Sequence, residues 1–176
     1  MPPMLKTREE PATHGISLRS DLRAGDIGAI SRLHGTVYAA EHGLDQRFEA
    51  GVAGGLAHAV EGGWPGRGAI RVAELDGRVA GSAALTVEGS SEGRLRFVLL
   101  DPALRGQGMG RRMVEELVAE ADSLELDLLD LITFSDLGTA GQIYRSMGFE
   151  VVETKRFSGW GRPILMQRYE RQRPAA

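Results

Sequence analysis

The pattern of apolar and polar residues in the first part of the chain predicts one strand and two helices. Residues 16–20 have the alternating character of a short strand. Over 26–38, apolar residues recur every three or four positions, which is the spacing of one helix face. A second helix is expected over 45–61, where three glycines weaken the prediction because glycine disfavours a helix interior.

The middle of the chain predicts a hairpin. Two largely apolar runs, 69–75 and 78–88, flank the dipeptide Asp76-Gly77. This dipeptide readily adopts the positive φ angles of a tight turn between antiparallel strands. The two runs are therefore expected to be neighbours in a sheet.

A third strand and a helix follow this hairpin. After a loop at 89–93, residues 95–100 end in a nearly continuous apolar run, which is typical of a strand covered on both faces. Pro102 ends the strand because proline cannot donate a hydrogen bond to the sheet. Residues 109–121 then form an amphipathic helix, apolar on one face and charged on the other. The later elements are expected to be a strand at 126–134, a helix at 139–147 and strands at 149–157 and 164–169.

This order of elements predicts a single α+β domain. We place the domain at residues 16–173 and expect residues 1–15, which are polar and contain three prolines, to be a flexible tail. No internal repeat and no interior linker interrupts the domain.

Composition narrows the class of function. The 176 residues are 42% hydrophobic and 26% charged, as in ordinary globular proteins. A net charge of -3 with scattered basic residues argues against nucleic acid as a partner. Because there is no cysteine, disulfides, thiolate-bound zinc and a thiol nucleophile are excluded, and we expect no metal. The sequence shows neither a leader nor a span of about 20 apolar residues, so we expect a cytoplasmic protein without a membrane partner.

A glycine-rich turn between a strand and a helix is the strongest sign of chemistry. Gly106, Gly108 and Gly110 would let backbone N–H groups approach a ligand closely at a helix N-terminus, where an anion is stabilised. Arg105 and Arg111 add positive charge on either side. A dinucleotide-binding loop would need glycine in place of Arg111, and the Gly-Lys-Ser/Thr of a P-loop is missing. A turn with no ligand is the alternative.

Two motifs together resemble those of the GNAT superfamily of N-acetyltransferases. The segment Arg105-x-x-Gly108-x-Gly110 resembles the loop that holds the pyrophosphate of acyl-CoA, and residues 140–149, AGQIYRSMGF, resemble the superfamily's A-x-x-x-Y-x-x-x-G-F segment. The resemblance implies a mixed, mostly antiparallel sheet of about six to seven strands, flanked by about four helices and splayed at the acetyl-CoA-binding strand. It also allows a homodimer.

A closer resemblance is to the acetyltransferase half of fusions with MarR-type regulators. The residues that carry it are His34, Gly35, Tyr38, Glu41, Gly43, 95–100 and 133–137. The sequence contains no regulator half, so DNA binding is not implied.

The superfamily resemblance implies acetyl-CoA as cosubstrate and assigns residues to it. The cofactor-binding residues would be Val98, Leu99, Leu100, Arg105, Gly106, Gln107, Gly108, Met109, Gly110, Arg111, Ala140 and Tyr144. A bulge would open the strand at 98–100, so that it pairs with the pantetheine arm and a backbone N–H polarises the acetyl carbonyl. One departure is Leu137, which stands where many members carry an asparagine that contacts the cofactor.

The same resemblance suggests catalytic groups, which the residues alone leave open. Tyr144 matches the usual proton donor to the departing sulfur, although a buried tyrosine on an apolar helix face is common. Glu41 is the candidate general base, with His42 as a second choice. His34 is expected to be a core residue, and Trp64 and Trp160 are either acceptor-site walls or packing residues.

The expected function is transfer of an acetyl group from acetyl-CoA to an amine of a small molecule or a peptide. The alternative is a CoA-binding sensor or interaction module that keeps the fold and has no activity. A preference for acyl groups larger than acetyl is also open.

Overall fold

The computed structural model describes residues 15–175. Its elements are β1 (Ile16–Arg19), α1 (Asp26–His42), α2 (Gln46–Glu61), β2 (Ala69–Leu75), β3 (Arg78–Glu88), β4 (Glu92–Leu100), the short 3₁₀ helix η1 (Pro102–Leu104), α3 (Met109–Ser123), β5 (Leu128–Phe134), α4 (Gly138–Ser146), β6 (Glu150–Phe157) and β7 (Ile164–Gln172). The predicted order is confirmed. Residues 1–14 of the expected tail lie outside the described part.

All seven strands form one sheet in the order β1-β2-β3-β4-β5-β7-β6. Neighbouring strands are antiparallel except β4 and β5, which are parallel. The mixed, mostly antiparallel sheet is therefore as expected. The predicted loop at 89–93 is too long, because β4 already begins at Glu92 and pairs there with Glu88.

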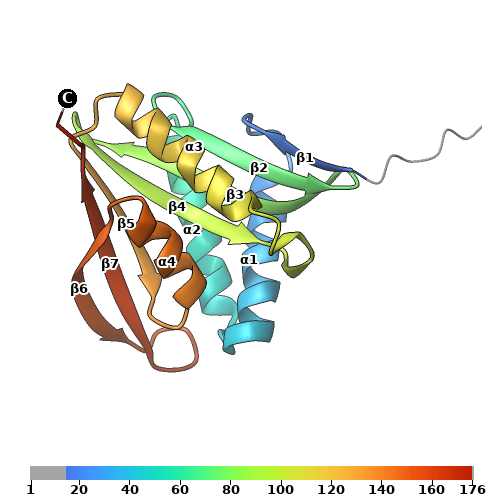
Figure 1. Ribbon diagram of the computed structural model, residues 1–176. Helices are drawn as coiled ribbons and strands as arrows, with labels where there is room; N and C mark the ends of the chain where they lie inside the picture. Colours follow the sequence, from blue (N-terminus) through green and yellow to red (C-terminus); the bar gives the residue numbers. More distant parts are fainter. Residues whose placement is uncertain (1–14, 176) are drawn as a thin grey trace, which may run out of the picture.

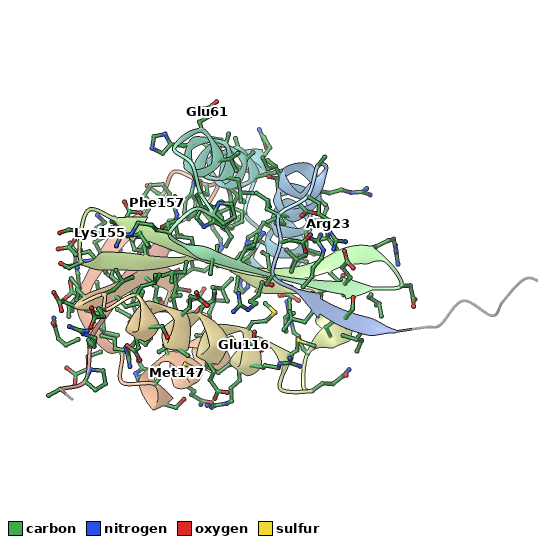
Figure 2. All side chains as sticks on the ribbon, turned by 90° about the horizontal axis from the view of Figure 1, so that it is seen from above. Arg23, Glu61, Glu116, Met147, Lys155 and Phe157 are labelled. Carbon is green, nitrogen blue, oxygen red and sulfur yellow. The ribbon has the colours of Figure 1, made fainter. Side chains whose placement is uncertain are left out.

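Helices cover both faces of the sheet. Figure 2, which looks along the layers, shows α1 and α2 on one side, where Glu61 ends α2, and α3 with Glu116 on the other side. Two hydrophobic cores follow from this arrangement. One lies under α3 and α4 and includes Met113 and Leu117, and the other lies under α1 and α2 and includes Ile30 and Leu56.

The sheet opens in its middle. β4 and β5 pair only at their first residues, from Glu92 opposite Leu128 to Leu95 opposite Leu131. Beyond these positions the two strands separate. Figure 1 shows β2, β3 and β4 lying at an angle to β5, β7 and β6, so that the two halves of the sheet form a V. The expected splay of the sheet at β4 is present.

A bulge in β4 lies at this opening. The pairing of β3 with β4 shifts register between Ser82 and Ala84, so two residues of β4 oppose one of β3. Phe97, inside the bulge, has a φ of 53°, which is unusual for a residue with a Cβ. The hydroxyl of Ser82 donates to the Phe97 carbonyl at 2.5 Å and holds the distorted backbone in place.

Candidate active site

A cavity of about 950 Å³ occupies the place where β4 and β5 part. One wall is α1 with part of α2, and the other is formed by the start of α3 and by α4. Residues Arg96–Leu100 of the bulged strand lie between the walls. The backbone of this part of β4 has no partner strand on its β5 side, so an extended ligand can pair with it as an added strand.

The N-terminus of α3 opens into this cavity. Gly106 and Gly108 have φ values of 76° and 78°, in the left-handed region that favours glycine, and a Cβ on either would meet no atom within 4 Å. No side chain hydrogen bond among the described residues caps the helix, and its first turn has no acidic residue. The amide of Arg112 donates to Gly108 inside the helix, and the amides before it in the first turn are left for a ligand. This terminus suits an anion.

Arg105 is turned towards α1. Its guanidinium donates to both carboxylate oxygens of Glu41, at 2.8 and 3.1 Å, and it also donates to the Leu100 carbonyl at 3.2 and 3.1 Å. Arg105, which is expected at the phosphates of the cofactor, therefore forms an ion pair with Glu41, the candidate general base. Both side chains are partly exposed, so this pair contributes about 0–1 kcal/mol and a bound anion can compete with it.

Tyr144 reaches the cavity from α4. Its side chain is 4% exposed and packs edge-on against Phe149 and Tyr169, with ring centroids 6.0 and 5.8 Å away. The hydroxyl makes no hydrogen bond to another described residue and is not sealed from solvent. Burial, and next the nearby hydroxyls of Tyr38 and Tyr169, raise the pKa of Tyr144 above its usual range. The phenol therefore keeps its proton at neutral pH and can donate a hydrogen bond into the cavity.

A stripe of three rings on α1 lies opposite. His34, Tyr38 and His42 follow at four-residue intervals, with centroids 6.0 and 5.4 Å apart. The Nδ1 of His34 lies 2.9 Å from the Ile30 carbonyl and so must carry the proton, which leaves Nε2 as an acceptor at the cavity. Burial lowers the pKa of His34 to about 4 and raises that of Tyr38 to about 12, so both are neutral near pH 7.

The cavity brings together most of the residues that the sequence singled out. Glu41 and all the expected cofactor-binding residues except Gln107, which is exposed, line it. Leu137 lines it without a polar group to offer, and Trp160 lines it beside Phe48. Trp64 is instead a core residue whose indole donates to the Leu85 carbonyl at 2.9 Å.

Among the cavity residues with no role assigned from the sequence, Tyr38 and Arg96 stand out. Each served only as part of a resemblance. Tyr38 could have been identified from the sequence, because it lies four positions from both His34 and His42 and so on the same face of the helix. The role of Arg96 depends on the bulge and on α2, which no local pattern reveals.

A splayed sheet that aims an uncapped helix N-terminus at a bulged strand defines an acyl-CoA-dependent acyltransferase. Comparison with known proteins agrees with this class. Residues 66–151 match the model of the acetyltransferase (GNAT) domain. An amino-acid acetyltransferase of Mycobacterium tuberculosis is 30% identical over 131 residues, which cover 74% of this chain and 67% of that protein. The chain belongs to the GNAT acetyltransferase family.

Solved structures share the fold. A Salmonella typhimurium protein assigned as an acetyltransferase, with its cofactor acetyl-CoA, aligns with a TM-score of 0.67 at 19% identity, covering 92% of this chain and 96% of that one. A ribosomal-protein-alanine N-acetyltransferase of Brucella melitensis aligns with a TM-score of 0.67 at 21% identity, covering 89% and 99%.

The residues present fit acetyl-CoA. The open space in front of Gly106 and Gly108 admits a pyrophosphate, and the unpaired side of β4 admits the extended arm. Within residues 15–175, no group of three or more histidine, aspartate or glutamate side chains is placed to hold a metal ion. No helix in that part of the chain is long and apolar enough to cross a membrane.

Proposed function

We propose that this acetyltransferase binds acetyl-CoA in the V between β4 and β5 and acetylates an amine that enters beside α1 and α2. The observation that carries the proposal is the convergence of three features on one cavity, namely the uncapped α3 N-terminus, the bulge at Phe97 and the Tyr144 hydroxyl. Bound acetyl-CoA supplies a thioester, which a neutral amine attacks directly with the CoA thiolate as leaving group.

Positioning is the main task of the chain in this reaction. The amides of residues 109–111 would hold the pyrophosphate, and the backbone of Val98 or Leu99 would donate an N–H to the acetyl oxygen as charge develops on it. Alignment of two reactants is worth roughly 7–11 kcal/mol, which exceeds what one proton transfer supplies. The bulge held by Ser82 therefore matters more than any single acid or base.

Proton movement involves groups on both walls. As the new C–N bond forms and the C–S bond breaks, Tyr144 would protonate or hydrogen-bond the departing sulfur. The amine must lose its protons on the other side. Glu41 can receive one only when its ion pair with Arg105 opens, and His42, whose Nε2 lies 3.9 Å from Glu41, is adjacent. The bare Nε2 of His34 can orient the amine or a water.

Several expectations stay predictions. They are the domain bounds at 16 and 173, a cytoplasmic location, a homodimer and the particular likeness to the acetyltransferase half of MarR-type fusions. The relatives do not select the acceptor, since one is named for amino acids and another for the alanine of a ribosomal protein.

The test is acceptor-dependent release of the CoA thiol. Acetyl-CoA is mixed with the protein and a panel of small amines, amino acids and peptides, and thiol release and acceptor mass are followed. We expect thiol release only with an acceptor, matched by gain of one acetyl group. Binding of acetyl-CoA without thiol release from any acceptor would favour the alternative of a non-catalytic CoA-binding module.

A further inference from the structure

Among residues 15–175, Arg96 is the one partly buried arginine whose side chain makes neither a hydrogen bond nor an ion pair to another described residue. The other arginine side chains of that part of the chain that lack both are Arg32, Arg78, Arg145 and Arg156, and all four are exposed. Its neighbour two positions away, Arg94, makes two hydrogen bonds of 2.7 Å to Asp130. Arg96 instead lines the cavity, and it also borders a second, smaller hollow of about 430 Å³ near the end of α2.

The surroundings of Arg96 place its side chain between α2 and the ring of Phe97, which itself lines the cavity. The guanidinium carbon lies 5.0 Å from the centroid of the Phe97 ring. On the other side α2 passes over it at Gly55, where an added Cβ would come within 3.1 Å of Arg96 Nη2 and 3.4 Å of the Phe97 ring. The glycine therefore leaves the room that the guanidinium occupies.

Arg96 carries its charge at a cost. Burial lowers its pKa, and the charges that act on it are Glu88 and Asp130, which favour the charged form, and Arg94, which opposes it. Both acids act at a distance, without a direct contact. A guanidinium keeps its proton under these conditions, so a desolvated one is best stabilised by an anion that it can bind with two parallel N–H groups.

The position of Arg96 points to the acceptor and away from the cofactor phosphates. The guanidinium lies under α2 at Gly55, whereas the glycine loop follows the C-terminal end of β4. In the pairing with β3, Arg96 and Leu100 lie opposite Ala84 and Gly81, which are three positions or about 10 Å apart at about 3.3 Å per residue. Val98, where the thioester carbonyl is proposed to lie, is in the bulge between them and closer to Arg96 than Leu100 is. An anion on Arg96 is thus within reach of an amine at the thioester.

We propose that Arg96 binds a carboxylate of the acceptor, so that the substrate is a free amino acid and not a peptide N-terminus or a simple amine. This rests on the proposed function. The carboxylate accepts two N–H groups from the guanidinium and the amine is thereby aimed at the acetyl carbon. A peptide N-terminus has its first carboxyl locked in an amide and offers this site no charge.

The test compares each common amino acid with its own C-terminal amide as acceptor. Charge-assisted hydrogen bonds to carboxylate predict that kcat/KM for the best acid exceeds that for its amide by roughly 10- to 100-fold. Arg96→Gln should bring this ratio close to one. Arg96→Lys should keep part of the ratio, because lysine has the positive charge but not the planar guanidinium that binds a carboxylate with two N–H groups. The matched control is Arg78→Gln, an exposed arginine on β3, which should keep the wild-type ratio.

A binding measurement makes the inference independent of turnover. Calorimetry with the N-acetylated form of the best amino acid should show binding to the wild-type protein and a loss of roughly 10-fold or more in Arg96→Gln, while acetyl-CoA affinity is kept. Wild-type protein that acetylates amides as well as acids, or an Arg96→Gln variant that loses acetyl-CoA, would overturn the carboxylate site and leave the acetyltransferase activity standing. Absence of thiol release with acids and amides alike would overturn both.

Discussion

At the scale of single residues, Tyr144 is the clearest case of a side chain whose environment suits one task. It is almost fully buried between two aromatic rings, yet its hydroxyl has no bonding partner among the described residues and reaches the cavity. Its raised pKa keeps the phenol protonated. A structural tyrosine in a core would be expected to satisfy its hydroxyl.

We expect Tyr144→Phe to lower kcat by roughly 10²–10⁴, the usual contribution of general acid–base catalysis, with acetyl-CoA affinity nearly unchanged. Steady-state kinetics and calorimetry measure the two quantities. A loss of about 10-fold would indicate a hydrogen bond to the sulfur without full proton transfer. The matched control is Tyr169→Phe, which removes the hydroxyl of the adjacent buried ring and its 3.3 Å bond to Gln167. Full activity in Tyr144→Phe would end the catalytic assignment.

The residues that line the cavity were only partly predictable from the sequence. Tyr144 and the three glycines of the loop could be found because a motif fixes their place relative to a strand and a helix. The pairing of Arg105 with Glu41 could not, because the two residues are 64 positions apart and meet only through the packing of α1 against the sheet. Arg96 was missed for the same reason, since α2 and the bulge define its surroundings.

At the scale of elements, the glycine loop and α3 act together. Gly108 is both the N-cap of α3 and a position with positive φ, and its side-chain direction faces open space. An added carboxylate there would meet the phosphates while leaving the fold in place. The effect of the negative charge can be separated from the effect of side-chain size by comparing aspartate with asparagine at position 108, since asparagine also tolerates the left-handed backbone conformation.

We therefore expect Gly108→Asp to abolish acetyl-CoA binding, because like charges would meet at the helix terminus, while Gly108→Asn weakens it less. Isothermal calorimetry gives both affinities, and circular dichroism shows whether each variant is folded. Equal affinities in the two variants, or wild-type affinity in Gly108→Asp, would refute the placement of the pyrophosphate.

Most helices and strands could be predicted from the sequence, and each error in the prediction has a physical cause. The patterns located every α-helix and strand but not the short 3₁₀ helix η1, and the hairpin at Asp76-Gly77 has the predicted bounds. The start of β4 was misplaced because Gly93 reads as a turn residue. In the sheet, however, close packing requires a glycine at this position, since a Cβ there would come within 2.7 Å of Leu126. The bulge at Phe97 has no local signature.

At the scale of the whole molecule, the opening of the sheet is what makes the site. β4 and β5 pair over only four residue pairs, and beyond them the two halves of the sheet are joined through the cores on its two faces, each of which includes residues of both halves. The cavity between these parting strands is lined by residues of both β4 and β5, so a ligand in it contacts both halves. Binding there should stabilise the whole fold.

The most direct test of this account is the melting temperature with and without saturating acetyl-CoA. A ligand at about 100 times its Kd that binds only the native state adds about 2.7 kcal/mol. For a domain of this size that corresponds to a rise of about 5–10 °C. We predict such a rise for the wild-type protein and none for Gly108→Asp. An unmoved melting curve for the wild-type protein, with no heat of binding in calorimetry, would contradict the assignment of the cavity to acetyl-CoA.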